Sequence, residues 1–498
     1  MINQGFIQAI ADDPDNDVHR LVYADWLEDN GEPERAEHIR LECEMFSLMD
    51  EGDVPYIWEC PRFYQLSDRA MALARKHSKK WFSPLLDDLM CGMKTRRGFP
   101  YSISMTSFDF VQHAVQLFEQ EPTIESVEIT NEIDRSMSKL AACPALALIR
   151  DLEFTDTLIR LSQLRALAKS PYLGSLRRLV FSSGDLRNGP DKAQALVDAR
   201  SLTNLEQLSL RFQMLRDKGA IALLSAPRFA TLKSLDLSVN ELTDESMIAL
   251  ADADHLQLTS LDVRHNRIGA KGLNALAHAS HLRRLEKLAI NGMAIGEDGA
   301  AQLAEASFLS NLRELSIADC GLTDEALSIL CRSEMPTLHR LIAGQNAIGE
   351  KVSDAWSSNG SWTQLRSLDL EEARFEVDAD LNSVSIPSLR ELRLFRCHFD
   401  SNSRSVLLHG ELLRSVRTFI LQASDVTDED VEVLSQNPAI SNVVYLSLEG
   451  NEITDRGAMA LANSPHLDQL QFLKMLGNDV RKKGKRAMKD RFGSRVSM

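Results

Sequence analysis

Short segments in which apolar and polar residues alternate recur along most of this chain. In Leu232–Leu237 the order is Leu-Lys-Ser-Leu-Asp-Leu, which is the period of a β-strand that is buried on one face. Between Leu205 and Val480 the pattern Leu-x-x-Leu-x-Leu-x-x-Asn-x-Ile, with substitutions, occurs eleven times at intervals of about 27 residues. A constant long period of this kind predicts a repeat architecture.

The copies align on their middle leucine. Three weaker copies centred on Val127, Leu152 and Leu179 precede the eleven, so we expect about fourteen rungs in total. The middle positions of the eleven strong copies are Leu208, Leu235, Leu261, Leu288, Leu315, Leu341, Leu368, Leu392, Phe419, Leu446 and Leu473.

Each strand segment is followed by a turn and then by a helical pattern. After Ile268 the small or apolar residues stand four, seven and eight positions further on, which is the stripe of an amphipathic helix. Sequences such as Thr243-Asp244-Glu245 supply a capping hydroxyl and first-turn acids at the helix starts. Asparagines at the turn, from Asn240 to Asn478, predict a ladder of buried amides. One such unit cannot bury its own apolar face, so the predicted fold class is an α/β solenoid with parallel strands on the concave face and helices on the convex face.

This pattern resembles the leucine-rich repeat family, specifically its ribonuclease-inhibitor-like class with long helical repeats. The resemblance covers residues 99 to 498 and implies that the concave face holds a partner. We place the solenoid at 99–480 and a basic last-rung helix and C-terminal cap at 481–498. The repeat around 376–387 lacks the helix stripe and is three residues short, so it is either a functional insertion or sequence drift.

The first hundred residues do not follow the repeat. Residues 1–50 carry thirteen acids against three arginines and predict three short helices, at about Asn3–Ala11, at about Val18–Asp29 and from Pro33 onward. The stretches Ala11–Glu28 and Glu34–Arg40 resemble a bacterial repeat-companion domain, a small all-α module whose biochemical role is unassigned. Residues 51–98 are similar to the bridge that such proteins place before the first repeat, and we expect them to form a helical N-terminal cap.

Composition and short motifs give little indication of a chemical function. No apolar run is long enough for a membrane helix, and the acidic start does not resemble a signal peptide, so we expect a cytoplasmic protein with no transmembrane segment. The seven cysteines show no metal-ligand spacing, and no nucleophile, phosphate-loop or metalloprotease motif is present. The sequence therefore predicts no catalytic residues, no cofactor and no metal.

The candidate binding residues are those expected to face outward from the strands, at the positions one before, one after and three after the middle leucine. An apolar set on four successive strands predicts a partner-binding strip, which we call the aromatic strip, although cross-strand packing explains it equally well. Next to it, charged residues on adjoining strands predict an ion-pair ladder rather than an acid/base pair. The candidates are Phe395, Ile420, Tyr445 and Phe472 in the strip, the charged residues Asp369, Glu371 and Arg393, and the more distant Arg211 and Arg264.

Three functions are compatible with these residues. The first is a non-catalytic cytoplasmic scaffold that binds an unknown protein partner on its concave face. The second, a regulator of a small GTPase, rests only on the similarity of the repeats to those of Ran GTPase-activating proteins. The third is binding of nucleic acid or of an anionic membrane surface by residues 481–495, which carry eight bases against one acid. Because this run keeps the helical register of the repeat, a capping helix with outward charges is the simpler interpretation, and nucleic acid is not the expected partner.

Overall fold

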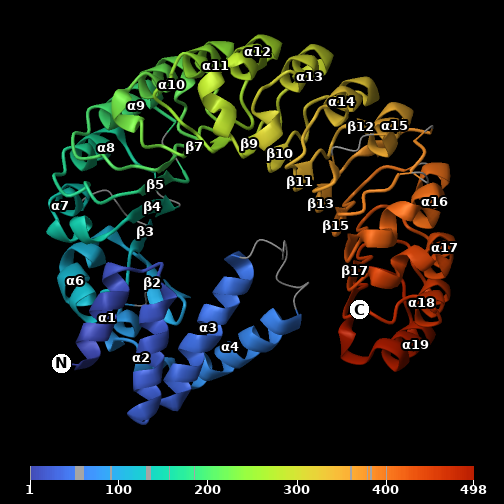
Figure 1. The fold of residues 1–498 in the computed structure, drawn as a ribbon, viewed down its shortest axis with the longest axis horizontal. Helices are drawn as coiled ribbons and strands as arrows, with labels where there is room; N and C mark the ends of the chain where they lie inside the picture. Colours follow the sequence, from blue (N-terminus) through green and yellow to red (C-terminus); the bar gives the residue numbers. More distant parts are fainter. Residues whose placement is uncertain are drawn as a thin grey trace. The chain divides into compact units, whose positions relative to one another are not determined.

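The structure is a computed structural model that describes residues 2–50, 61–89, 92–130, 136–155, 158–183, 186–358, 362–377, 379–381, 384–399 and 401–498. The chain forms two compact units, Met1–Asn240 and Glu241–Met498. In each unit, strands form one layer on the concave side and helices form the other layer on the convex side (Figure 1). The predicted α/β solenoid is therefore confirmed.

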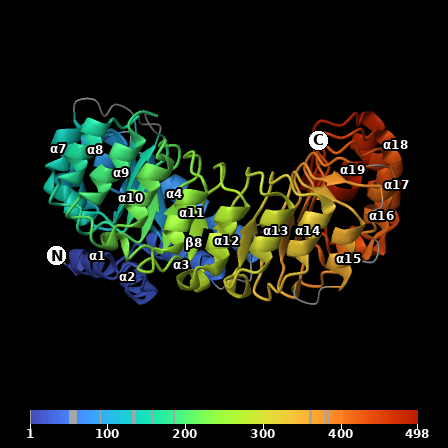
Figure 2. The same ribbon diagram turned by 90° about the horizontal axis from the view of Figure 1, so that it is seen from above.

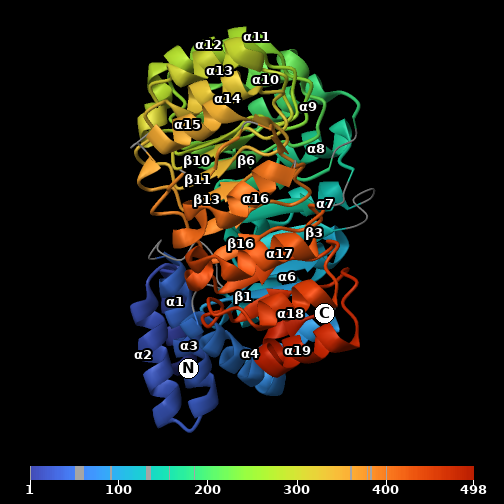
Figure 3. The same ribbon diagram turned by 90° about the vertical axis from the view of Figure 1, so that its right-hand side faces the viewer.

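The first unit begins with helices that pack around their own apolar core. The predicted helices are confirmed, and Ile10, Tyr23, Leu27, Ile39 and Phe99 pack together in one buried cluster. The helices are α1 Ile2–Asp12, α2 Asp17–Asp29, α3 Pro33–Asp50, α4 Pro61–Trp81 and α5 Pro84–Asp88. Figure 3 shows those labelled α1 to α4 side by side.

The sheet of the first unit starts with an antiparallel hairpin, β1 Gly92–Arg96 with β2 Phe99–Met105. All later pairings in this unit are parallel and join strands in chain order. The strands are β3 Ser126–Thr130, β4 Asp151–Thr155, β5 Arg178–Phe181, β6 Gln207–Ser209 and β7 Ser234–Asp236. The helices are α6 Ser107–Gln120, α7 Met137–Ala141, α8 Leu161–Ala168, α9 Gly189–Val197 and α10 Arg216–Leu224, with the 3-10 helix η2 Pro144–Leu148 before β4.

The second unit repeats strand, turn and helix in parallel register. The middle leucines pair directly, for example Leu315 with Leu341 and Leu341 with Leu368. Its main strands are β8 Ser260–Asp262, β9 Lys287–Ala289, β10 Glu314–Ser316, β11 Arg340–Ile342, β13 Ser367–Asp369, β15 Glu391–Arg393, β16 Thr418–Ile420, β17 Tyr445–Ser447, β18 Phe472–Lys474 and β19 Val496–Ser497. Two short strands, β12 Ala347–Ile348 and β14 Arg374–Phe375, form a separate pair.

Helices cover the other side of the second unit, as Figure 2 shows for α11 to α19. They are α11 Asp244–Ala251, α12 Ala270–His278, α13 Gly296–Ala304, α14 Asp324–Cys331, α15 Glu350–Ser358, α16 Ser401–His409, α17 Asp428–Gln436, α18 Asp455–Ala462 and α19 Lys482–Phe492. Between β14 and β15 the described residues form no helix, in agreement with the missing stripe in the sequence. In α19 the apolar Met488 and Phe492 are buried while the lysines point outward.

The asparagine ladder is present as predicted. Asn346 donates hydrogen bonds from Nδ2 to the carbonyls of Ile317 and Ala343 at 2.9 and 3.0 Å, and its Oδ1 accepts one from the N–H of Leu322 at 3.0 Å. Asn451 makes the same contacts in its own rung. Each amide therefore satisfies backbone groups of two neighbouring rungs that no water reaches. Thr157, at the corresponding turn of the weaker copy centred on Leu152, lies outside the described residues.

Among the described residues, no helix combines the length and the apolar character that crossing a membrane requires.

Candidate partner-binding surface

The outward side chains of the second unit form three parallel rows on the strand face. Because neighbouring strands pair in register, residues at the same position relative to the middle leucine lie side by side. The rows are the positions one before, one after and three after that leucine. Residues of one row are therefore the nearest neighbours across adjacent strands.

Tyr445 and Phe472 belong to the same row and form an aromatic pair. They are directly opposite each other on β17 and β18, and their ring centroids are 6.2 Å apart. Both side chains are half-buried. The pair thus presents a rigid apolar surface that is still open to solvent.

The aromatic strip is not one continuous row, and that part of the prediction is wrong. Ile420 is one position after its middle residue, where it pairs with Arg393 and Ser447, and only 8% of it is exposed. Phe395 is three positions after its middle leucine, and the guanidinium of Arg396 lies 4.9 Å from its ring centroid. Positions four residues apart along a strand are separated by about 13 Å. Parallel register therefore separates Phe395 from the Tyr445–Phe472 pair.

The charged residues beside the strip form an ion-pair cluster, as the sequence suggested. Arg393 Nε lies 3.2 Å from Asp369 Oδ2, and Arg393 Nη1 lies 3.6 Å from Glu391 Oε1. Glu391 is completely buried and accepts a hydrogen bond from Ser367 Oγ at 2.7 Å. Burial and the neighbouring Asp369 raise the pKa of Glu371. One arginine therefore contacts two carboxylates on this face.

Glu391 was missed by the sequence analysis. It is a charged residue at an outward position, and such positions were assumed to be solvated. Its burial follows from its neighbours on the adjacent strands, which a single rung does not reveal.

Arg264 and Arg211 occupy equivalent positions in different units. Arg264 folds back on Asp262, with Nη2 2.6 Å from Oδ2 and Nε 2.9 Å from both carboxylate oxygens. Asp262 is thus engaged in an ion pair. Arg211 is exposed, just after β6.

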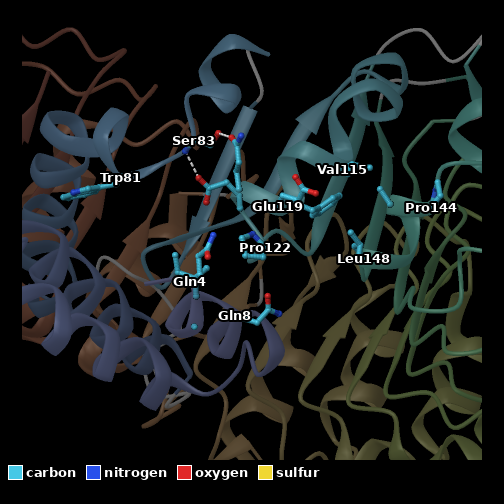
Figure 4. A pocket seen from close by; sticks show the side chains of 15 residues that line it. Gln4, Gln8, Trp81, Ser83, Val115, Glu119, Pro122, Pro144 and Leu148 are labelled. Carbon is cyan, nitrogen blue, oxygen red and sulfur yellow. Dashed lines mark hydrogen bonds between the residues drawn. The ribbon is translucent and has the colours of Figure 1, made fainter. Parts of the chain in front are cut away.

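A second surface feature is a pocket of about 1100 Å³ in the first unit (Figure 4). Helices α1 and α6, the end of α4 and η2 surround it. Val115 and Leu148 form an apolar wall and are 62% and 58% exposed. Glu121 also lines the pocket; its Oε1 accepts a hydrogen bond from the N–H of Ser83 at 2.6 Å, and burial raises its pKa. No motif in the sequence signalled this pocket, because its walls come from four separate elements.

Ion pairs join two of the acidic helices. Arg40 lies 2.7 Å from both Asp25 Oδ1 and Glu28 Oε2, which ties α3 to α2. Asp25 thus has a local structural partner.

A model of the family described as "Leucine Rich repeat" matches residues 230–251, 257–277, 308–331 and 439–462. No curated protein matches the chain at a significant level. Solved structures with a similar arrangement include an internalin from Listeria monocytogenes (17% identity, 70% of this chain and 81% of that one, TM-score 0.37). Others are the mouse RP105/MD-1 complex (15%, 76% and 71%, TM-score 0.41) and the yeast Rad7 and Elc1 complex (16%, 85% and 93%, TM-score 0.42).

Proposed function

We propose that this leucine-rich repeat protein is a non-catalytic cytoplasmic scaffold that binds a protein partner on the strand face of its second unit. Leucine-rich repeat proteins generally mediate protein–protein interaction. The observation that carries the proposal is the half-buried pair Tyr445 and Phe472 on adjacent strands. Aromatic anchors of this kind supply much of the binding energy at protein interfaces.

Polar and apolar residues also lie farther along the same face, mostly in the row three positions after the middle leucine. Gln422 donates a hydrogen bond to Glu449 at 3.1 Å and another to Ser447, and Lys474 follows Phe472 on the strand. Leu476 is 48% exposed just beyond β18. An apolar pair with polar residues elsewhere on the same face resembles the apolar centre and polar rim of protein interfaces.

The remaining candidate residues have supporting roles in this proposal. Phe395 with Arg396 is a second contact point at the far side of the same face. Asp369, Glu371, Arg393 and Arg264 keep that face rigid and charged, while Arg211 and the acidic helices α1–α3 belong to a separate contact of the first unit. A rigid face reduces the conformational entropy that is lost on binding.

The test starts with parallel affinity purification from native lysate, using the wild-type chain and the variant Tyr445→Ala/Phe472→Ala. The partner that the wild type retains is then purified, and its Kd is measured by calorimetry. Loss of two anchors should weaken binding by at least about a hundredfold, at roughly 2 kcal/mol each. The melting temperature should fall only slightly, because both rings are half-exposed.

Met459→Ala is the matched control. Met459 is 42% exposed on α18, in the helix layer of the same unit. A partner that binds the double variant normally but loses affinity for Met459→Ala would place the interface on the helices and remove the proposed site.

A further inference from the structure

One edge of the strand layer carries a row of basic residues. Arg313, His339, Arg366, Arg390 and Arg417 immediately precede β10, β11, β13, β15 and β16. We call this row the edge ladder. Backbone hydrogen bonds of 2.8 Å join each member to the preceding one, from the N–H of His339 to the carbonyl of Arg313 and onward to Arg417. The five residues are therefore consecutive neighbours in space.

The edge ladder has defined ends. The residue before Arg313 in this row is Glu286, which forms an ion pair with it at 3.7 Å. The residue after Arg417 is the buried Val444. The chain as a whole has a net charge of −16, so four arginines and one histidine in five successive rungs are a local excess of basic residues.

The last two rungs of the ladder open into a cavity of about 740 Å³. Arg390, Arg414 and Arg417 line it together with hydroxyl and amide side chains, including Ser415 and Asn442. The one carboxylate among its lining residues, Glu411, is paired with Arg414. Two guanidinium groups are left without a carboxylate partner in this lining.

Arg390 is held in place by the backbone. Its Nη1 donates to the carbonyls of Leu389, Pro387 and Ser415 at 3.1, 3.2 and 3.3 Å. Its other two guanidinium nitrogens, and the whole exposed side chain of Arg417, have no hydrogen-bond partner among the described residues. A guanidinium that is already fixed loses little entropy when it binds an oxyanion.

We infer that the edge ladder is a binding site for an extended acidic segment, rich in Asp and Glu, of a partner protein. Arginine pairs with carboxylates through two parallel hydrogen bonds, and arginine clusters recognise acidic motifs. Four intervals between five neighbouring strands span about 19 Å, the length of about six extended residues. The site lies on the edge of the sheet and does not depend on the aromatic pair.

The cavity favours a peptide over nucleic acid. Its lining contains no aromatic side chain. Proteins that bind single strands combine basic grooves with aromatic rings on which bases stack. The net charge of −16 also opposes the approach of a long polyanion, whereas a short acidic segment needs only the local field.

The test uses a fluorescein-labelled peptide of eight glutamates and measures its Kd for the full chain by fluorescence anisotropy. Arg417→Gln should weaken binding about tenfold, and Arg390→Gln/Arg417→Gln should weaken it further, since each removes a charge-assisted contact. Arg417→Gln disturbs no internal contact among the described residues, so its fold is expected to be retained. Tyr445→Ala/Phe472→Ala should bind the peptide normally.

The matched control is Lys482→Gln/Lys485→Gln, which removes two exposed charges from the rival basic helix α19. Loss of peptide binding in this control, with normal binding by Arg390→Gln/Arg417→Gln, would overturn the inference. So would equal binding of an eight-residue glutamine peptide, or tighter ladder-dependent binding of an oligo(dT) strand. Normal binding by the control and no binding of the glutamine peptide would support it.

Discussion

The carboxylate of Asp244 in α11 accepts a hydrogen bond from the backbone N–H of Gly272 in the next helix, α12, at 2.9 Å. The same oxygen accepts another from the N–H of Gly269 at 2.7 Å. The first turn of a helix has backbone N–H groups without partners inside the helix, and it carries a partial positive charge. A carboxylate from the preceding rung accepts hydrogen bonds from these N–H groups and also interacts favourably with that charge. The relationship recurs between Asp324 and Val352, between Asp428 and Gly457, and between Asp455 and Gly484.

At Gly272 the contact with the preceding rung is tight. A Cβ atom added to Gly272 would lie 2.6 Å from Asp244 Oδ1 and 2.8 Å from Ile268 Cγ2. We expect Gly272→Ala to lower the free energy of unfolding by about 1–3 kcal/mol, the usual cost of overpacking a tight site. Urea denaturation followed by circular dichroism measures it.

Gly269→Thr is the control for this prediction. A Cβ atom at Gly269 meets nothing closer than 3.8 Å. Thr454, at the corresponding place in another rung, donates its hydroxyl to Asp428. The control should leave stability unchanged or slightly raised. A loss of stability equal to that of Gly272→Ala would mean that crowding against Asp244 is not the cause.

The local signals in the sequence predicted these helix starts, but not the bond between rungs. Thr243 caps its own helix, as its type indicates, by accepting a hydrogen bond from the N–H of Glu245. The sequence predicts that Asp244 stabilises the start of this same helix, because an acid in the first turn interacts favourably with the helix dipole. Its actual partners come about 25 residues later in the chain, and only the sideways stacking of helices places them within reach. The period of the repeat predicts that the helices stack side by side, but it does not predict how far one helix is shifted relative to the next.

The asparagine ladder should be more sensitive to loss of a buried amide than to loss of a half-buried one. Asn451 is 7% exposed and bonds to the backbone of two rungs, through Leu421 and Ser424 among others. Asn451→Ala leaves several buried backbone groups unpaired, and we expect a loss of about 2–4 kcal/mol in the free energy of unfolding. Asn478→Ala, at a half-buried position near the chain end, should cost less. Equal losses in the two variants, measured by urea denaturation, would contradict this explanation.

The candidate site was predicted less well than the fold, for a reason visible in particular residues. The sequence identified Tyr445 and Phe472 as outward aromatics, and they form a pair. It grouped them with Phe395 and Ile420 because all four lie on or next to successive strands, without separating the rows that register imposes. The sequence also predicts that residues at outward positions of the strands are exposed to solvent. This prediction fails for Ile420 and Glu391, because neighbouring strands cover them. The edge ladder stands two positions before the middle leucine, outside the three rows from which the sequence predicts binding residues.

Stability should fall in mild acid because of a buried histidine in the first unit. His38 is 1% exposed and stacks on Trp81 with ring centroids 5.0 Å apart. Burial, with a further contribution from Arg35, lowers the pKa of His38 to about 4. An unfolded histidine has a pKa of about 6.5. The unfolded state therefore binds more protons between pH 6.5 and 4, so stability rises with pH across this window and is lost as the pH falls.

The size of this effect is about 3 kcal/mol at most, since one pKa unit corresponds to about 1.4 kcal/mol. The check is urea denaturation of the wild type and of His38→Gln at several pH values between 4 and 7. The variant should show a flatter dependence, whatever its absolute stability. Burial raises the pKa values of Glu42 and Glu121, so these two carboxyl groups change stability with pH in the direction opposite to His38. Both groups are present in the wild type and in the variant. Identical slopes for the two proteins would show that His38 does not carry the effect.

The basic helix α19 should not make this chain a nucleic-acid-binding protein. Its Met488 and Phe492 are buried, so the helix closes the last rung. Some of its positive charges have acidic partners. Arg491 pairs with Asp468, and Arg486 pairs with Asp490 at 3.7 Å. With a net charge of −16 on the whole chain, we expect no binding of duplex DNA or single-stranded RNA in a gel-shift assay at physiological salt.

Weak binding at low salt is compatible with this expectation only if it vanishes as salt rises to the physiological range, because each phosphate contact contributes a steep salt dependence. The same assay with Lys482→Gln/Lys485→Gln shows whether α19 or the edge ladder is responsible for the binding of nucleic acid. Binding that persists at physiological salt and is abolished by this variant would establish a nucleic-acid function for α19. It would also mean that the last helix contributes more than a cover for the apolar end of the repeats.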